Sequence, residues 1–306
     1  MRRVCPCSAP ATSLGPVTIA LVTDSTAYLP FGLAEAEGIG VVPLHVIVGG
    51  RQHREGVDIT AQEVAAALRD FRPVSTSRPA PQAFSDVYDG LIADGAQAIV
   101  SVHISAAMSS TVGGAEIAAT TAAVPVTVID SRTLGMAMGY AVLSGARAAR
   151  AGASAVEVAD LVRRTCAAST VAFYVDTLEY LRRGGRIGKA SALLGSALAI
   201  KPLLGLIDGQ IVPLEKVRTS SRAIARLEEI ALEATLSPPA GSFGFDLAVH
   251  HLDSADRAER LAERLQARAG DAVTVSVVEL GAVVGAHVGP GTLAVACVPR
   301  FVVPEG

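Results

Sequence analysis

Short apolar runs alternate with longer amphipathic segments in the first half of the chain. Continuous apolar runs predict buried strands at residues 17–22, 39–48, 98–104 and 124–129. The segments between them predict helices at residues 31–37, 58–69, 82–94, 112–119 and 133–151, with a polar turn at 49–56. Strands that alternate with helices of this length indicate βαβ units and a parallel sheet.

Beyond about residue 152 the pattern changes. Asp208 and Gly209 lie between two apolar runs, 203–207 and 211–217, which predicts a hairpin. The remaining predicted strands are 171–175, 245–250, 273–278 and 292–298; the helices are 152–166, 176–183, 186–200, 220–236 and 254–269; and 281–291 is a glycine-rich loop. A hairpin combined with βα units indicates a mixed sheet.

These patterns predict an α/β chain of two domains. We expect a disordered tail at residues 1–16 and a mostly parallel, Rossmann-like domain at 17–152. A second α/β domain with a mixed sheet is expected at 153–306, with exchange of segments between the two allowed.

Three stretches rich in hydroxyl groups, at residues 23–26, 75–77 and 105–111, are expected as turns at the carboxyl edge of the sheet. Ligands of α/β sheets bind at this edge. A hydroxyl-rich turn that leads into a helix offers unpaired N–H groups to an anion such as a carboxylate. Simple helix N-capping explains each stretch taken alone, and several stretches at one edge favour a binding crevice.

The composition excludes several classes of protein. Half of the 306 residues are hydrophobic, none is Trp, and the formal net charge is −3. This charge argues against nucleic-acid binding, and no apolar run reaches the ~20 residues of a membrane span. The first 16 residues lack the apolar core of a signal peptide. Four cysteines without metal-ligand spacing fit a reducing compartment, so we expect a soluble, cytoplasmic protein without bound metal.

Most motifs of catalytic chemistry are missing. The chain contains no G-x-G-x-x-G and no G-x-S-x-G, and residues 184–189 resemble a phosphate loop without its first glycine. His250 and His251 are expected as a surface pair at a strand end rather than metal ligands. His287 lies between glycines, where it could donate a hydrogen bond to a carboxylate or simply bond to backbone carbonyls. Arg186 follows two glycines, a setting that suits anion recognition.

Several segments carry a resemblance to a known family. They are VTDSTAYLP at 22–30, TSRP at 76–79, ISAAMSST at 104–111, DTLEYLRRGGRIGKA at 176–190, IKPLL at 200–204, KVRT at 216–219 and GAHVGPG at 285–291. They follow the order of the DegV family, which the chain resembles over roughly residues 17–298. The resemblance implies a bacterial, cytoplasmic fatty-acid carrier of the DegV-type fold. Such a carrier has no cofactor and no catalysis of its own, and it serves phospholipid metabolism.

The resemblance also implies roles for individual residues. Thr76 and Ser109 match the family's carboxylate hydrogen-bonders, and His287 matches a histidine near the carboxylate. Ser77 and Ser105 lie in the same hydroxyl-rich stretches and are expected to join them. The expected ligand is a long-chain fatty acid such as palmitate, stearate or oleate, with transient membrane contact allowed.

Arg186 and Arg218 match arginines expected on the face that meets a separate ATP-dependent fatty acid kinase or the transferred phosphate. The chain departs from the family at Arg78, where Gln is usual, and at Ala106 and Ser110 beside the carboxylate site. Ala106 removes a hydroxyl, and Ser110 places a Cβ where a glycine is usual.

The composition agrees with a lipid carrier, because a buried acyl chain gains about 0.8 kcal/mol per CH₂ in an aliphatic cavity. Two other functions stay open from the residues. One is an acyl-ester hydrolase that uses Ser105, Ser109 or His287, against which the missing G-x-S-x-G argues. The other is a sensor of a small molecule that is not a lipid.

Overall fold

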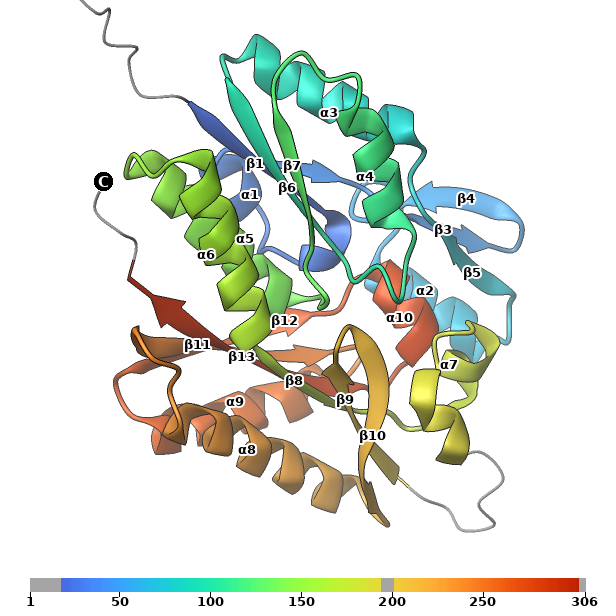
Figure 1. The fold of residues 1–306 in the computed structure, drawn as a ribbon. Helices are drawn as coiled ribbons and strands as arrows, with labels where there is room; N and C mark the ends of the chain where they lie inside the picture. The colour runs from blue at the N-terminus through green and yellow to red at the C-terminus, as the bar shows by residue number, and fades with distance from the viewer. Residues whose placement is uncertain (1–17, 194–200, 303–306) are drawn as a thin grey trace, which may run out of the picture.

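A computed structural model describes residues 18–193 and 201–302 of the chain. Its first sheet has four parallel strands in the order β2-β1-β6-β7, as the sequence predicted (Figure 1). The strands are β1 (Ile19–Asp24), β2 (Ile39–Val42), β6 (Ala98–His103) and β7 (Val126–Asp130). Helices α3 (Pro81–Ala93) and α4 (Thr111–Ala119) cover one face of this sheet, and α5 (Met136–Arg150) and α6 (Ala155–Ala168) cover the other.

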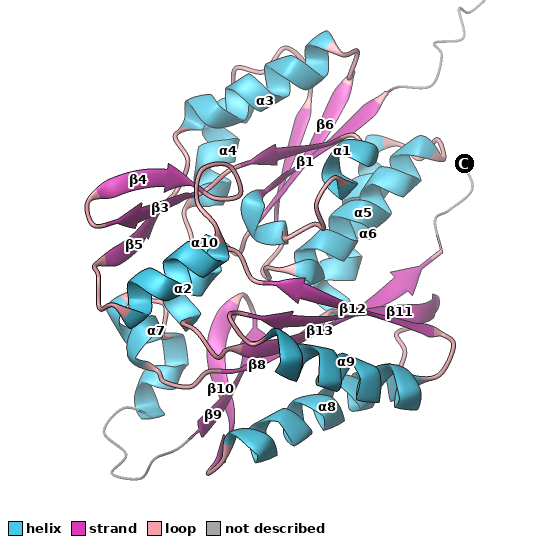
Figure 2. Cartoon of the chain, turned by 180° about the vertical axis from the view of Figure 1, so that it is seen from behind, coloured by secondary structure: helices cyan, strands magenta, loops and turns pink. Residues whose placement is uncertain are grey.

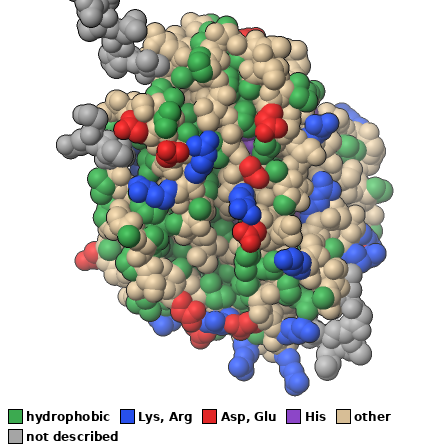
Figure 3. All heavy atoms as spheres, in the orientation of Figure 1, with side chains coloured by type: hydrophobic (Ala, Val, Ile, Leu, Met, Phe, Trp, Pro, Cys, Tyr) green, Lys and Arg blue, Asp and Glu red, His purple; other side chains and the backbone are tan. Residues whose placement is uncertain are grey.

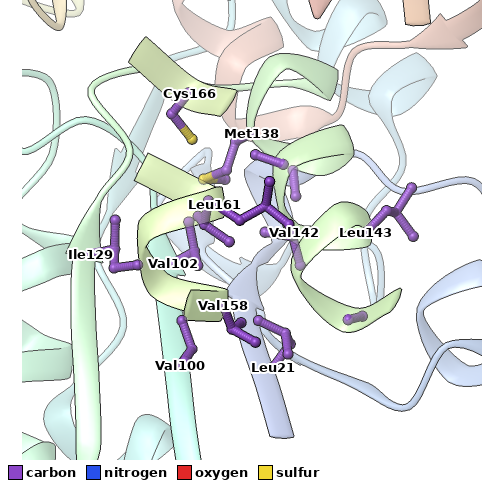
Figure 4. Packing of buried hydrophobic residues seen from close by; sticks show 14 of the residues in the cluster. Leu21, Val100, Val102, Ile129, Met138, Val142, Leu143, Val158, Leu161 and Cys166 are labelled. Atoms are coloured by element: carbon purple, nitrogen blue, oxygen red, sulfur yellow. The ribbon is translucent and has the colours of Figure 1, made fainter. Parts of the chain in front are cut away.

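The core beneath α5 and α6 is aliphatic. Val100 and Val102 of β6 lie close to Met138, Val142 and Leu161 of the two helices (Figure 4). Five of the fifteen residues of α5 are alanine and two are glycine. Small residues let the helix approach its neighbours closely, which explains why a chain with few aromatic residues still fills this layer.

The second sheet has six strands in the order β10-β9-β8-β13-β11-β12. They are β8 (Thr170–Tyr174), β9 (Lys201–Ile207), β10 (Gln210–Val217), β11 (Ser242–His251), β12 (Val273–Glu279) and β13 (Leu293–Phe301). All neighbours pair antiparallel except β11 and β12, which confirms the mixed sheet and the hairpin at Asp208-Gly209. Helices α8 (Ser220–Leu236) and α9 (Ala255–Ala269) pack on one face only (Figure 1). The other face points toward the first sheet.

A small antiparallel sheet was not predicted. It has the order β4-β3-β5, with β3 (His45–Val48), β4 (Arg51–Arg54) and β5 (Val74–Ser77). The expected single strand at 39–48 and the turn at 75–77 are therefore wrong, and the turn expected at 49–56 contains β4. Pro43 interrupts the first strand, and Gly49 and Gly50 with positive φ close a two-residue hairpin between β3 and β4.

The expected glycine-rich loop at 281–291 is also wrong, because residues Ala282–Val288 form helix α10. Figure 2 shows α10 and α2 (Ala61–Arg69) lying beside the small sheet. Ala282, Val283 and Ala286 of α10 share a core with Leu44 and Val46 of the small sheet's segment. Burial of these apolar side chains outweighs the low helix propensity of Gly285.

The short elements connect these layers. They are η1 (Ser25–Ala27), α1 (Leu33–Ala36), α7 (Glu179–Arg183) and η2 (Gly188–Leu193). The predicted helix at 186–200 begins as the 3₁₀ turn η2, and its remainder lies outside the described residues, as does the tail at 1–16 with Cys5 and Cys7. None of the helices described is both long and apolar enough to cross a bilayer. The boundary at residue 152 stays a prediction, since α6 contacts β6, β7 and β13.

The α6 layer allows a test of this core. Leu161 is 4 % exposed, whereas Val156 on the same helix is 70 % exposed. We expect Leu161→Ala to lower the free energy of unfolding by about 2–5 kcal/mol, since it leaves a cavity. Val156→Ala is the matched control and should change it by less than ~0.5 kcal/mol. Urea unfolding followed by circular dichroism measures both, and equal effects would contradict this packing.

Candidate functional site

A cavity lies between the uncovered face of the six-stranded sheet, the turn after β6 and helix α10. The space not filled by atoms there is about 940 Å³, its open mouth included. Its apolar lining includes Leu134, Val171, Phe173, Leu206, Val283, Val284, Ala294 and Ala296. Its polar lining includes Thr76, Ser77, Arg78, Ser109, Arg186, His250, His287 and Thr292.

Strand alternation produces the apolar wall. Phe173 of β8 pairs with Ala294 of β13, and Val171 pairs with Ala296. Residues two apart point to the same face of a sheet, so these four side chains form one continuous surface. The intervening residues Ala172 and Val295 pack against the core under α8 and α9 instead.

Thr76 and His287 meet in the polar part of the lining. Strand β5 positions Thr76 and the last turn of α10 positions His287, and the Thr76 Oγ1 atom lies 2.8 Å from His287 Nε2. Gly184 makes room for the imidazole, because a Cβ added there would lie 2.0 Å from His287 Nδ1. The sequence motifs at 76–79, 184–186 and 285–291 thus meet at the imidazole ring of His287.

His287 is uncharged at neutral pH. Burial lowers the pKa of its imidazole to about 4, and the nearby positive charge of Arg186 adds to this shift. The Nδ1 atom is buried and has no hydrogen-bond partner among the described residues. A neutral imidazole carries one N–H, so His287 can donate one hydrogen bond at the cavity.

Ser109 and Arg186 form the rim beside this pair. The Ser109 N–H donates to Ser105 O at 3.0 Å in the turn after β6, and Ser109 Oγ lies 2.8 Å from Thr111 Oγ1. Arg186 Nε donates to Met108 O at 3.2 Å, and its Nη1 donates to Gly184 O at 2.7 Å. Met108, Ser109 and Arg186 also line a shallow polar groove outside the cavity. The rim therefore has hydroxyl donors and a cation that faces solvent.

The N-capping explanation of the hydroxyl-rich stretches holds at one place and fails at another. Asp24 caps η1, where its carboxylate accepts a hydrogen bond from Thr26 N–H at 3.0 Å. Ser110 stands at the N-cap of α4 but makes no side-chain cap hydrogen bond. Of the hydroxyl side chains in the stretch 105–111, that of Ser109 lines the cavity.

Two of the predicted residues lie elsewhere. Ser105 is fully buried, and its hydroxyl donates to Gly209 O at 2.8 Å, so it ties the hairpin β9–β10 to the turn after β6. Arg218 is exposed just beyond β10 and lines neither the cavity nor the rim groove. Thr76, Ser77, Ser109, Arg186 and His287 do come together in one lining.

His250 is a lining residue that sequence reasoning placed wrongly. We expected it with His251 at the surface, but both lie in β11 between β12 and β13 and are 3 % and 8 % exposed. Burial lowers the pKa of His250 to about 4, and its Nε2 accepts a hydrogen bond from Met136 N–H at 3.1 Å. Its position in the apolar run 245–250 was the signal that favoured a buried strand.

The chain also contains a buried Asp–His–Ser series that resembles a hydrolase triad. Asp24 Oδ2 lies 3.1 Å from His103 Nδ1, and His103 Nε2 lies 2.7 Å from Ser101 Oγ. Ser101 is fully buried, and its hydroxyl also contacts Tyr88 OH at 2.8 Å. A nucleophile must reach its substrate, so this network stabilises the first sheet rather than performs hydrolysis.

Comparisons with known proteins agree along almost the whole chain. The family model described as "Uncharacterised protein, DegV family" matches residues 18–300. A DegV domain-containing protein of Streptomyces coelicolor is 50 % identical over 277 residues, which are 90 % of this chain and 97 % of that protein.

Two solved structures are similar as well. A DegV family protein from Thermus thermophilus, described by its fatty-acid binding, has a TM-score of 0.84 and 33 % identity, with 92 % of this chain and all of that chain covered. DegV of Bacillus subtilis, described as a fatty acid binding protein, has a TM-score of 0.84 and 30 % identity, with 93 % of this chain and all of that chain covered.

The environment of His287 gives a titration test. We expect the His287 ring to titrate near pH 4 in histidine NMR spectra and to be neutral at pH 7, because burial disfavours the charged form. Arg186→Gln removes a neighbouring positive charge and should raise the titration midpoint. A His287 midpoint at its ordinary value near 6.5 would contradict the buried geometry.

Proposed function

The chain belongs to the DegV family, and we propose that it binds a long-chain fatty acid in this cavity and presents the carboxylate to a separate ATP-dependent fatty acid kinase. The observation that carries the proposal is the contact of Thr76 with His287, beside Ser109 and Arg186, at the rim of an apolar cavity. The fatty-acid binding of the related proteins from T. thermophilus and B. subtilis supports it.

The two parts of the lining match the two parts of such a ligand. Each methylene that enters the wall formed by Phe173, Val171, Ala294 and Ala296 gains about 0.8 kcal/mol. A carboxylate that leaves water costs several kcal/mol unless donors meet it. The hydroxyls of Thr76, Ser77 and Ser109, with the neutral His287, supply those donors at the rim. Palmitate, stearate and oleate are the ligands we expect.

The chain's part in the reaction is to bind and orient the acid. The kinase would transfer the γ-phosphoryl group of ATP to a carboxylate oxygen, which yields an acyl phosphate and ADP. In this proposal Arg186, at the rim, interacts with the negative charge of the transferred group. The only phosphate-loop-like segment of the sequence, 184–189, lacks its first glycine. We therefore assign ATP binding to the partner. We also propose that the protein acts in the cytoplasm, where ATP is available, and that it has no cofactor of its own.

The partner would meet the rim and the arginines near it. Figure 3 shows Lys and Arg side chains gathered toward the lower right of this face, where Figure 1 places α7 and the hairpin β9–β10. Arg218 lies exposed after β10 and Arg186 at the rim. We propose both for the partner or phosphate face. Basic side chains there favour encounter with a nucleotide-bearing partner.

A hydrolase function is less well supported. A serine or threonine nucleophile needs a base held by a third group. The Thr76–His287 pair has no such third group among the described residues, since His287 Nδ1 is unpartnered there.

Binding can be tested directly. Native mass spectrometry of the purified protein should show a co-purifying fatty acid. Thr76→Val removes one hydroxyl without loss of volume and should weaken fatty-acid affinity about tenfold, since a hydrogen bond to a charged group contributes ~1.5–3 kcal/mol. Ser75→Ala, an exposed position on the same strand, is the matched control and should bind normally. A wild-type protein that is empty and ignores added palmitate and oleate would overturn the proposal.

Presentation to a kinase needs a second test. With a DegV-type kinase partner and ATP, we expect Arg218→Ala to lower the rate of acyl phosphate formation at least fivefold at unchanged fatty-acid affinity, because it removes a charge outside the cavity. Arg222→Ala, an exposed arginine at the start of α8, serves as control. Equal rates for wild type and Arg218→Ala would exclude Arg218 from this face.

A further inference from the structure

Glu55 follows β4 and is a buried carboxyl that contacts the helix carrying His287. It is 5 % exposed, and its Oε1 accepts a hydrogen bond from Val283 N–H of α10 at 2.7 Å. Ser25 Oγ donates to Oε2 at 2.5 Å, and Tyr28 OH donates to Oε1 at 3.3 Å. Tyr28 OH in turn accepts from Val284 N–H at 3.1 Å. One carboxyl thus joins the turn after β1 to the first turn of α10.

The chain enters α10 in direct contact with this carboxyl. A Cβ added to Gly281 would lie 2.4 Å from Glu55 Oε1 and 2.4 Å from Tyr28 Cε1. The residues that follow, Val283 and Val284, line the fatty-acid cavity. The position of α10 therefore sets one wall of that cavity, and Glu55 contacts its start.

On the other side of α10, Glu55 borders a second, open pocket. Leu280 lines both this pocket and the fatty-acid cavity, so Leu280 and the start of α10 separate the two. The charged residues that line the open pocket besides Glu55 are Asp24, Asp58, Glu63 and Glu279. A small displacement of α10 would expose the Glu55 carboxyl to water there.

We propose that Glu55 is a positioning residue for fatty-acid binding: its uncharged form holds α10 against the cavity, and its ionised form favours separation of α10 and release of the fatty acid. This rests on the proposed function of the cavity. The carboxyl is buried at a junction whose opening would hydrate it, and a charge gains more from hydration than a neutral acid does.

The groups around Glu55 determine the sign. The pKa of Glu55 is raised to about 7: burial is the largest cause, the charge of Asp24 also raises it, and the hydrogen bonds from Ser25, Val283 and Tyr28 lower it. A hydrated Glu titrates near 4.5. The closed state therefore binds the proton more tightly. The stabilisation of the closed state relative to the open state is complete below about pH 4.5 and is lost as pH rises through 7.

Tyr28, His250 and Arg54 also lie near this junction. Tyr28 has its pKa raised well above the ordinary value by burial and by Glu55, so it stays protonated. His250, whose ring packs edge-on against Tyr28, titrates near pH 4. Arg54, which precedes Glu55, is paired with Asp58. Among Glu55, Tyr28 and His250, Glu55 is the group whose pKa lies near neutral pH.

The test is the release rate of a bound fluorescent fatty acid, chased with oleate between pH 5.5 and 8.5. We expect the wild-type release rate to rise about tenfold over this range. The difference between the pKa of Glu55 in the closed state and in water allows a larger change than this. Glu55→Gln keeps the shape and removes the charge, so its release rate should be independent of pH and no higher than the wild-type rate at pH 5.5. Glu157→Gln, which alters the exposed capping box of α6, is the control and should follow wild type.

A second variant and a measurement without ligand distinguish a failure of this inference from a failure of the proposed fatty-acid binding. Tyr28→Phe removes a hydrogen bond that lowers the Glu55 pKa, so the midpoint of the release profile should move to higher pH. Amide exchange of residues 282–288, corrected for intrinsic rates, should rise with pH in wild type and not in Glu55→Gln. A wild type that binds but releases at a pH-independent rate overturns this inference. Absence of binding at every pH overturns the proposed function, while amide exchange still decides the role of Glu55.

Discussion

The docking of α10 is the contact on which the rest of the site depends. Six of its seven residues are buried. One side packs with Leu44 and Val46, and the other side, with Val284 and Val288, packs with Phe173 of the six-stranded sheet. A short helix with so few hydrogen bonds of its own is stable only through such packing. Because α10 belongs to both cores, it closes the cavity and aims His287 at the same time.

The parts of the fold with regular periodicity were predictable from the sequence. Continuous apolar runs identified β1, β6 and β7, and Asp208-Gly209 identified the hairpin. The small sheet was missed because its strands have four residues each and β4 reads RQHR, without apolar alternation. Helix α10 was missed because its glycine-rich composition favours a loop and only tertiary packing makes it helical. Local pattern is informative where an element is long, and tertiary contacts decide where it is short.

The site was predictable in its residues but not in its geometry. Family resemblance marked Thr76, Ser109, Arg186 and His287, which the fold gathers in one lining. No pattern within the sequence placed residue 76 against residue 287, because that contact follows from the unpredicted β5 and α10. The hydroxyl of Ser105 looked equivalent to that of Ser109 in the sequence. The turn after β6 points the first to Gly209 and leaves the second at the rim.

The place of α10 in the chain has a consequence for biosynthesis. The parallel sheet is complete by residue 130, whereas the helix that closes the cavity comes at residues 282–288, followed by β13 at the centre of the second sheet. A polypeptide emerging from the ribosome can thus bury much of its first core long before the cavity is complete. Until residues 282–288 have been made, the cavity lacks one wall and His287, so chains that stop short of this helix have an incomplete site however well their first half is folded.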